Sequence, residues 1–431
     1  MKHLAAIVLA AGLATAAAAQ SHPCPADTNV DGQVSPTDFT AWVAAYNAGD
    51  TDIADQNGDG AITPTDFTAW INNYNTGCNL NDGDNDRVPD IYENNTGQYY
   101  RLFATGTNPN NPDSDGDNLF DGDEIYGTTT GVNLPGMGAN PNHKTVFVEI
   151  DWTEDNHDTS FHSHRPRPGM VSRVQTAFAN APLSNPDGID GVDFIIDYGQ
   201  GGLFNGGTEI LDGTNPEYLD FGYNWLLDYM DESRRGYFHH GVFTHRYNSP
   251  TNGSSGVAYL NSDAFFVTLY QFWDWDEANA NTLMHEIGHN FGLHHGGFES
   301  RNRKPNYNSV MNYNNQFPGI DTNCDGFGDG VLDYSRGFNP DLNENALVEA
   351  DGICGVPIDW NESGSINGGT VSRNINCSNL NTTSCGSTGS CDDNTCDVLR
   401  DQNDWQAMNF LGQSRMIHPV IIECDNPVPS R

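Results

Sequence analysis

The sequence predicts an α+β fold with a twisted, mixed sheet, preceded by a small all-α module. Two β-rich runs, TVFVEIDW (145–152) and VDFIIDYG (192–199), flank PGMVSRVQTAFANA, whose apolar residues have helical spacing. This strand–helix–strand order is typical of a partly parallel sheet. A long helix is predicted in WDEANANTLMHEIGHNFGL, and a loop–helix segment is duplicated near the N-terminus.

Three further elements are predicted between the second run and the long helix. NWLLDYMDESR has the spacing of a helix, YFHHGVFTHRY that of a strand, and GVAYLNSDAFFVTLY (256–270) gives another strand and its continuation. Asp274 or Asp276 is placed to cap the long helix. These elements together predict one main domain over residues 140–431.

The chain is strongly acidic. Of its 431 residues, 58 are Asp or Glu and 18 are Lys or Arg, so the formal net charge is −40. A field of this sign repels nucleic acid and anionic membranes, which argues against nucleic-acid binding. Solubility alone would also explain acidity, but many acids stand at alternate positions in loops such as DSDGDNLFDGDE. That spacing favours bound calcium.

The N-terminal residues predict export. Lys2, an apolar run and three alanines in succession have the order of a secretory signal peptide over residues 1–19, with an apolar part too short for a membrane anchor. No later run reaches the length of a spanning helix, so no membrane insertion is expected. The mature protein is expected to be secreted and extracellular or associated with the cell surface.

The nine cysteines fit this prediction, because export favours disulfides. Cys24 and Cys78 bracket one short segment and are expected to pair. The other seven lie beyond residue 320, and those from 377 to 424 are expected to staple the C-terminal region. The odd total leaves one thiol unpaired or joined to another chain.

Two loops in the duplicated segment have the spacing of calcium ligands. DTNVDGQVSPTDFTAW begins at Asp27 and DQNGDGAITPTDFTAW begins at Asp55. Each 12-residue loop has glycine at position 6 and oxygen ligands at positions 1, 3, 5, 9 and 12. The predicted ligands are Asp27, Asn29, Asp31, Ser35, Asp38, Asp55, Asn57, Asp59, Thr63 and Asp66. After each loop, FTAW opens an amphipathic helix.

This duplication, over residues 24–78, resembles a dockerin module. The resemblance implies a calcium-binding module at residues 20–79 that docks onto a cohesin-like receptor. Position 12 departs from an EF-hand loop, since aspartate replaces the bidentate glutamate. A calcium-stabilised cap without a partner would carry the same loops.

Residues 80–139 are acidic and rich in Gly, Asn and Pro, and two runs in them share one spacing. The predicted calcium ligands are Asp82, Asp84, Asp86, Asp90 and Glu93, then Asp113, Asp115, Asp117, Asp121 and Glu124. The runs resemble thrombospondin type-3 calcium repeats. With so few apolar residues we expect no core, and therefore a semi-rigid spacer ordered by calcium. A disordered acidic linker is the alternative.

The stretch HEIGHNFGLHHGG holds four of the 14 histidines. His285 and His289 are four residues apart, so on a helix they share one face and can hold one zinc ion. Gly292 permits the positive φ that ends the helix and brings His295 back to the same ion. Glu286 lies at the edge of that face, where it can reach water on the metal. Three neutral histidines leave one position open, which is the mark of a catalytic zinc site.

In this register the stretch is HExxHxxGxxH, which resembles the motif of metzincin metallopeptidases. SVMNY (309–313), 14 residues beyond His295, resembles the Met-turn of that family. The resemblance implies a metzincin-like catalytic domain over residues 140–431, with Met311 as an apolar floor beneath the metal. It also implies that Tyr313 lies beside the zinc, where it ligates the metal or stabilises the oxyanion.

The resemblance implies a zinc-dependent endopeptidase acting on proteins or peptides. Zinc lowers the pKa of bound water, and Glu286 takes the proton and passes it to the leaving amine. GVAYLNSDAFFV is then expected to be the edge strand along which substrate pairs. A non-catalytic adhesion or scaffold protein is the alternative, although degenerate enzymes usually lose the general base. Hydrolysis of a non-peptide amide or ester has no supporting motif.

Other polar residues are weaker candidates for a role at the zinc site. His294 is one residue off the ligand register. His239, His240 and His245 lie on a predicted strand near the cleft, where packing is favoured over a functional role. FDGD resembles a latency motif whose last residue, Asp123, would bind zinc, but it lies inside a calcium-type run. No cysteine-switch prosegment is recognised.

The C-terminal region contains two candidate calcium loops and a candidate helix. DTNCDGFGDGVLD (321–333) repeats the alternating pattern of oxygen ligands, and IDWNESGSIN (358–367) repeats it less fully. Ordinary Asp/Asn/Gly turns are the alternative for the second. DQNDWQAMNFLG (401–412) is expected to form a closing helical segment.

Overall fold

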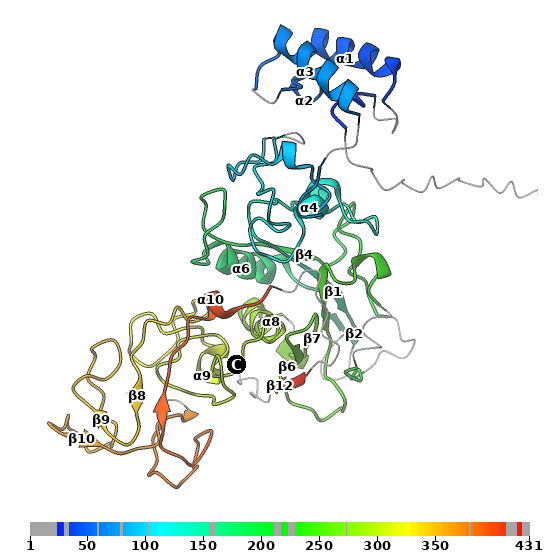
Figure 1. Cartoon of the computed structure of the whole chain (residues 1–431). Helices are drawn as coiled ribbons and strands as arrows, with labels where there is room; N and C mark the ends of the chain where they lie inside the picture. Colours follow the sequence, from blue (N-terminus) through cyan, green and yellow to red (C-terminus); the bar gives the residue numbers. More distant parts are fainter. Residues whose placement is uncertain are drawn as a thin grey trace, which may run out of the picture.

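Figure 1 shows the computed structural model, with a small helical unit, a body built on a sheet and a strand-poor C-terminal region. The described residues are 24–29, 34–57, 60–77, 81–100, 104–155, 161–210, 217–222, 229–272, 274–378, 381–410 and 420–424. The predicted signal peptide, Asp31, Asp59 and Cys78 lie outside them. No helix in the described part of the chain has both the length and the apolar character needed to cross a membrane.

A six-stranded mixed sheet forms the centre of the body, in the order β12-β6-β7-β5-β1-β4. Its strands are β1 (Thr145–Trp152), β4 (Asp193–Asp197), β5 (Phe238–Phe243), β6 (Gly256–Leu260), β7 (Ala264–Val267) and β12 (Val420–Cys424). The pairings among β4, β1, β5 and β7 are parallel, and those of β6 with β7 and β12 are antiparallel. The predicted mixed, partly parallel sheet is confirmed, and it is compatible with a metzincin-like domain.

Strand β1 lies inside the sheet, between β5 and β4, and its apolar residues alternate over both buried faces. All eight of its residues are buried. Val146, Val148 and Ile150 point into the core that the sheet shares with helices α6 (Pro168–Ala179) and α8 (Asp276–Asn290). The alternate residue Phe147 belongs to a second cluster on the opposite face.

Helix α8 carries the histidine motif and is held by its own apolar residues. Leu283 and Ile287 are fully buried in the core. The predicted cap is wrong: the residue before the helix is Trp275, which makes no capping hydrogen bond through its side chain. Asp276 instead lies in the first turn, where its carboxylate pairs with Arg167 (Nε to Oδ1, 3.2 Å) and complements the helix dipole.

Two other predicted elements differ from the structure. GVAYLNSDAFFVTLY forms two antiparallel strands, β6 and β7, because Asn261 takes a left-handed conformation (φ 49°) and starts a turn. η3 (Tyr270–Phe272) follows β7. Part of NWLLDYMDESR lies outside the described residues, and its described end forms only the 3₁₀ turn η2 (Glu232–Arg234).

The acidic segment before β1 packs onto the sheet. Leu119, Leu134 and Met137 contact the cluster around Phe147 and Phe238. Its helices are η1 (Asp90–Tyr92), α4 (Asp121–Tyr126) and α5 (Leu134–Met137). The expectation that this segment lacks a core is therefore wrong, because its few apolar residues use the back of the sheet as their partner.

The helical unit comprises α1 (Pro36–Ala48), α2 (Thr51–Ala54) and α3 (Pro64–Thr76). Helices α1 and α3 begin just before FTAW, each at a capping box with proline in the first turn. Trp42 and Trp70 are buried between them, with ring centroids 6.3 Å apart. Cys24 is disulfide-bonded, and its predicted pairing with Cys78 remains a prediction because Cys78 lies outside the described residues.

The C-terminal region has little regular structure. Its elements are α9 (Tyr313–Gln316), β8 (Leu342–Asn343), β9 (Leu347–Val348), β10 (Thr370–Val371), β11 (Val398–Leu399) and α10 (Asp404–Ala407). Three disulfides join Cys324 to Cys354, Cys377 to Cys391 and Cys385 to Cys396. They supply the cross-links that short ladders cannot, and they fit an extracellular protein. The predicted closing helix is shorter than expected.

Candidate metal centres and active site

The three histidines of the long motif converge at the end of α8. The ring centroids of His285 and His289 are 4.9 Å apart, and the ring of His295 lies 5.3 Å and 4.9 Å from them. One ligand atom from each histidine and one from Cys424 all lie within 4.8 Å of one another. We call His285, His289 and His295 the helix cluster.

The turn after α8 brings His295 to the cluster. Gly292 has a φ of 96°, as its place in the motif predicts. Its backbone N–H donates to the His289 carbonyl at 2.9 Å, which closes the helix. A Cβ at this glycine would lie 2.4 Å from Oδ1 of Asn261, so the β6–β7 turn also requires its absence.

Backbone hydrogen bonds orient the first two rings. Nδ1 of His285 donates to the Val310 carbonyl at 2.9 Å, and Nδ1 of His289 donates to the Leu293 carbonyl at 2.6 Å. Such bonds fix the tautomer and leave Nε2 for a metal. Nε2 of His285 is buried and has no hydrogen-bond partner among the described residues. The donor set therefore fits a zinc ion held by imidazole nitrogens.

The protonation state of the rings also fits a metal. Burial lowers the pKa of His285 to about 4. Burial, followed by repulsion from the neighbouring rings, holds the pKa values of His289 and His295 well below their ordinary value. All three imidazoles are therefore neutral at physiological pH, which is the form that binds metals.

Glu286 lies beside the cluster, fully buried. Burial raises its pKa well above the ordinary value, and a hydrogen bond from the Cys424 thiol opposes that shift. Its Oε1 atom has no hydrogen-bond partner among the described residues. A Cβ at Gly256 would lie 2.3 Å from this oxygen, so only glycine at the start of β6 leaves room for the carboxylate.

The SVMNY segment lies beneath and beside the rings. Met311 is fully buried, and a Cβ at Gly288 would lie 2.5 Å from its sulfur, so the methionine packs directly on the glycine of α8. The ring of Tyr313 lies 4.5 Å from that of His295. Its hydroxyl donates to the Glu423 carbonyl at 3.4 Å. The roles of Met311 and Tyr313 at a bound metal remain predictions.

Cys424, which is not among the predicted site residues, completes the surroundings of the helix cluster. Its Sγ lies 3.3 Å from Oε2 of Glu286, 3.4 Å from Nε2 of His289 and 3.8 Å from Nε2 of His295. It is buried and stands outside the disulfides. The odd number of cysteines was the only sequence signal for it, because 129 residues separate it from His295.

The edge strand is not open to substrate as expected. β12 pairs antiparallel with β6 over its whole length, from Val420 opposite Leu260 to Cys424 opposite Gly256. The chain itself therefore takes the position that strand addition offers to a peptide.

Most of the other polar residues lie outside the helix cluster. His294 bridges to Gly297. Asp123 pairs with Arg87 and does not reach the histidines, so it does not occupy the position of a latency residue. His239 contacts Asn290. Nε2 of His240 lies 2.8 Å from Oδ2 of Asp151, and the two residues converge with Glu149 in a further buried group, so the predicted packing role of His240 stays a prediction.

His245 belongs to a second histidine-rich group. It converges with Asp155, His162 and His164, all buried, with one ligand atom from each within 4.8 Å of the others. We call these four residues the ladder cluster, because the ladder of β2 (Glu154–Asp155) and β3 (His162–Ser163) carries two of them. The alternation HSH in the sequence was a signal for it.

The acidic repeats bring carboxylates together beside β1. Asp86 and Glu93 of the first run converge with Asp121 of the second, and Asp82, Asp84 and Asp86 form a further group. Burial raises the pKa values of Asp86, Glu93 and Asp121 to about 8. Burial, then repulsion from neighbouring carboxylates, raises the pKa values of Asp115 and Glu124 well above ordinary.

Some of the predicted calcium ligands accept hydrogen bonds from backbone N–H groups. Asp90 accepts from the backbone N–H of Gly83 at 2.6 Å, and Asp113 accepts from that of Asn118 at 2.8 Å. In the helical unit, the carboxylates of Asp38 and Asp66 accept from the backbone N–H groups of their loops at 2.7 Å. These bonds order the loops around oxygens that face inward.

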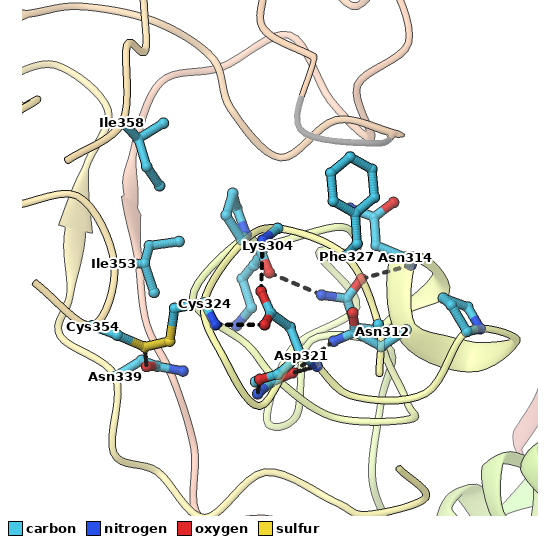
Figure 2. Close-up of a pocket in the computed structure, with 16 residues that line it drawn as sticks. Lys304, Asn312, Asn314, Asp321, Cys324, Phe327, Asn339, Ile353, Cys354 and Ile358 are labelled. Atoms are coloured by element: carbon cyan, nitrogen blue, oxygen red, sulfur yellow. Dashed lines mark hydrogen bonds between the residues drawn. A yellow bond between two sulfur atoms is a disulfide. The ribbon is translucent and has the colours of Figure 1, made fainter. Parts of the chain in front are cut away.

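A pocket of about 320 Å³ lies beside α9, as Figure 2 shows. It is lined by Asn312, by Asn314 of α9, by Asp321 and by the Cys324–Cys354 disulfide. Neither the rings of the helix cluster nor Glu286 line it, so we assign it no role in the chemistry.

Comparison with known proteins gives one finding. A family model described as Metallo-peptidase family M12B Reprolysin-like matches residues 212–296, which include the helix cluster and Glu286. No curated protein and no solved structure matches the chain. The family match and the converging histidines together support a zinc metallopeptidase of the metzincin type.

Proposed function

We propose that the chain is a zinc-dependent endopeptidase. The observation that carries the proposal is the convergence of three neutral imidazoles, with ligand atoms within 4.8 Å of one another, and the buried carboxylate of Glu286 follows the first of them on the same helix. His285, His289 and His295 hold the metal, and no fourth histidine or carboxylate of the described residues joins them. An N₃ site with one position left for an exchangeable ligand is the catalytic form of a zinc centre.

A zinc ion bound there supplies a Lewis acid and lowers the pKa of water. Glu286 accepts the proton of the attacking water and donates it to the leaving amine. Its raised pKa, caused by burial, brings the group closer to the operating pH, as a general acid–base residue needs. The Tyr313 hydroxyl donates to the oxyanion that forms on the substrate carbonyl.

Peptide cleavage and metal content test the proposal together. We expect hydrolysis of casein or a quenched-fluorescent peptide library, loss of activity with 1,10-phenanthroline, and recovery on addition of zinc. The assay is run on the full chain and on Cys424→Ser, because that thiol lies 3.4 Å from Nε2 of His289. A folded protein that contains zinc but cleaves nothing in either form would leave the non-catalytic adhesion or scaffold function as the better account.

Calcium is proposed to stabilise the acidic segment. Oxygens of Asp84, Asp86, Glu93, Asp115 and Glu124 are buried without hydrogen-bond partners among the described residues. Leaving ionised oxygens buried and unpaired is costly, and divalent cations with oxygen preference remove that cost. Isothermal titration with calcium should show binding in the full chain.

Anchoring is proposed for the helical unit. It is supported by two near-identical loop–helix halves, packed through Trp42 and Trp70, that present Phe39 and Phe67 partly exposed. We propose that the module binds calcium and docks onto a cohesin-like receptor of a secreted assembly. Pull-down with a cohesin domain, with and without calcium, tests this; a calcium-bound module that retains nothing would mark it as a stabilising cap.

A further inference from the structure

The ladder cluster is a second metal site in geometry and burial. Oδ2 of Asp155 lies 2.7 Å from Nε2 of His164 and 3.2 Å from Nδ1 of His245. Its other oxygen, Oδ1, lies 3.6 Å from Nε2 of His162. The exposed fraction of each of these side chains is at most 4%. One carboxylate and three imidazoles thus surround a single point away from solvent.

The sheet topology produces this convergence. β1 and β5 run parallel and end together at Trp152 and Phe243, which are register partners. Asp155 follows the end of β1, and His245 follows the end of β5, so the two arrive at the same edge of the sheet. His162 is the ladder partner of Asp155, and the backbone N–H of His164 donates to the Thr153 carbonyl at 3.0 Å.

The arrangement of the group is that of a ligand set. Three imidazoles share one carboxylate, and Nε2 of His162 lies 3.6 Å from its Oδ1. Their ring centroids lie 4.9 to 6.0 Å apart, with one pair inclined at 71° and another at 73°, which resembles the arrangement in the helix cluster. We propose that Asp155, His162, His164 and His245 bind a structural zinc ion. Four protein ligands with no position left for solvent are the form that structural zinc sites take, and imidazole nitrogen and carboxylate oxygen are both zinc ligands.

Metal analysis of the purified full chain tests this site. We expect two zinc equivalents in the wild type, one in His164→Gln and one in His289→Ala. His143→Gln removes a buried imidazole that pairs with Asp187, outside both clusters, and should keep two. The proposal would be overturned if the wild type bound one zinc equivalent and His289→Ala bound none.

A second measurement covers the case in which His164→Gln does not fold. Anomalous diffraction at the zinc edge from wild-type crystals needs no variant. We expect a peak between His162 and His245 besides the peak at α8. A single peak at α8 would exclude zinc at the ladder cluster, whatever the variants do.

A separate observation concerns the regulation of the helix cluster, and it rests on the proposed function. β12 runs antiparallel to β6, as a peptide added to that edge would, and places Cys424 at the histidines. The Cys424 carbonyl accepts from the Ser254 hydroxyl at 2.6 Å and from the Ser255 backbone N–H at 3.3 Å. The strand end is therefore held on both its backbone and its side chain.

We infer that residues 420–424 are a built-in inhibitor in which the Cys424 thiolate takes the open position on the zinc. The proton that the thiol loses has an acceptor at Oε2 of Glu286, 3.3 Å away. The same contact occupies the general base. A peptide substrate can pair with β6 only after β12 leaves, so the strand and the substrate exclude one another.

Cobalt substitution tests the contact without an activity assay. We expect a thiolate-to-cobalt charge-transfer band in the near ultraviolet of the cobalt-loaded chain. The band should be lost in Cys424→Ser while the d–d bands of the histidine-bound ion remain. Glu423→Gln, an exposed neighbour on β12, should keep it. Absence of the band in the wild type would overturn the inference.

Activity then separates the inference from the proposed function. We expect Cys424→Ser to raise kcat/KM by about ten-fold or more, because the substrate-competent fraction of chains increases. A thiolate band with no cleavage by either form would contradict the proposed peptidase function and support the contact between Cys424 and the metal. Equal cleavage by both forms, without the band, would contradict inhibition by Cys424 and support the proposed peptidase function.

Discussion

The two histidine-rich clusters use similar side chains in different surroundings. The helix cluster has three imidazoles from one helix and the turn after it, with Glu286 and a thiol beside them. The ladder cluster has three imidazoles and a carboxylate from three separate segments, and all four are buried. In the proposed roles, Cys424 and an exchangeable ligand compete for the fourth position of the first cluster, whereas buried histidine and aspartate side chains fill all four positions of the second. The number of fixed ligands, rather than the number of histidines, separates a reacting centre from a stabilising one.

The neighbouring groups sharpen this difference. At the helix cluster, Glu286 is close to the rings but its Oε1 has no hydrogen-bond partner among the described residues. At the ladder cluster, hydrogen bonds from His164 and His245 overcome the effect of burial and hold the pKa of Asp155 well below its usual range. One carboxylate is left able to exchange a proton, and the other is fixed as an anion.

Glu286→Gln has the largest expected effect and tests whether the helix cluster alone is reactive. Turnover should fall by about 10²–10⁴-fold because the general base is lost. The metal content should stay the same, since the three imidazoles are unchanged. Kinetics and metal analysis of the same preparation measure both. Retained turnover would mean that Glu286 is not the general base, and the proposed reactivity of the helix cluster would lose its support.

His245→Ala and His289→Ala compare the clusters directly. His245→Ala should lower the free energy of unfolding by about 3–5 kcal/mol, because Asp155 is left as a buried anion with an incomplete partner set. His289→Ala should abolish cleavage with a smaller loss of stability. Urea unfolding, followed by circular dichroism, gives the two values. Equal losses would mean that the clusters do not differ in role.

Calcium removal extends the comparison to sites made of oxygen ligands. Without calcium, the folded pKa values of Asp86, Glu93 and Asp121 are raised to about 8, so the folded state holds protons that the unfolded state has released. In EGTA, stability should therefore be highest below about pH 4 and fall as the pH rises towards 8.

Added calcium should reverse that pH dependence and raise the melting temperature at pH 8. At a concentration 100 times the dissociation constant, each site contributes about 2.7 kcal/mol. Calorimetry at pH 5 and pH 8, each with EGTA or calcium, gives the four values needed. If stability changed equally between pH 5 and pH 8 with and without calcium, the acidic runs would not bind calcium and would serve only to keep the protein soluble.

Gly288→Ala has the smallest expected effect and probes the floor of the helix cluster. The added methyl group would lie 2.5 Å from the Met311 sulfur, so the methionine must move. We expect a loss of about 1–3 kcal/mol in stability, typical of overpacking, with zinc retained. Ala280→Gly, on the same helix, is a control for helix propensity, with an expected cost of about 1 kcal/mol. A Gly288→Ala protein as stable as the wild type would show that Met311 is not a rigid support.

The central strands and the helix cluster could be predicted because their information is local. TVFVEIDW is a β-rich run with apolar residues on both alternate faces, and it becomes a strand buried on both faces. The spacing of His285, His289, Gly292 and His295 follows helix geometry, and the rings converge as expected. The predicted site roles of these residues remain predictions, which the experiments above address.

The other features depend on which distant segments become neighbours. The ladder cluster needs the parallel pairing of β1 with β5, and Cys424 needs the pairing of β12 with β6. Spacing within one segment carries no information on such pairings. The division of residues 256–270 into two strands depends on the turn conformation of Asn261, and composition alone does not fix that conformation.

The covalent continuity between the body and β12 has a kinetic consequence. Trp405 of α10 is buried in the central core, and β12 belongs to the same chain. A ligand that belongs to the same chain as its site binds intramolecularly, so its occupancy does not depend on the dilution of the protein. The inferred restraint by Cys424 should therefore not weaken when the protein is diluted, and only displacement of β12 should release it.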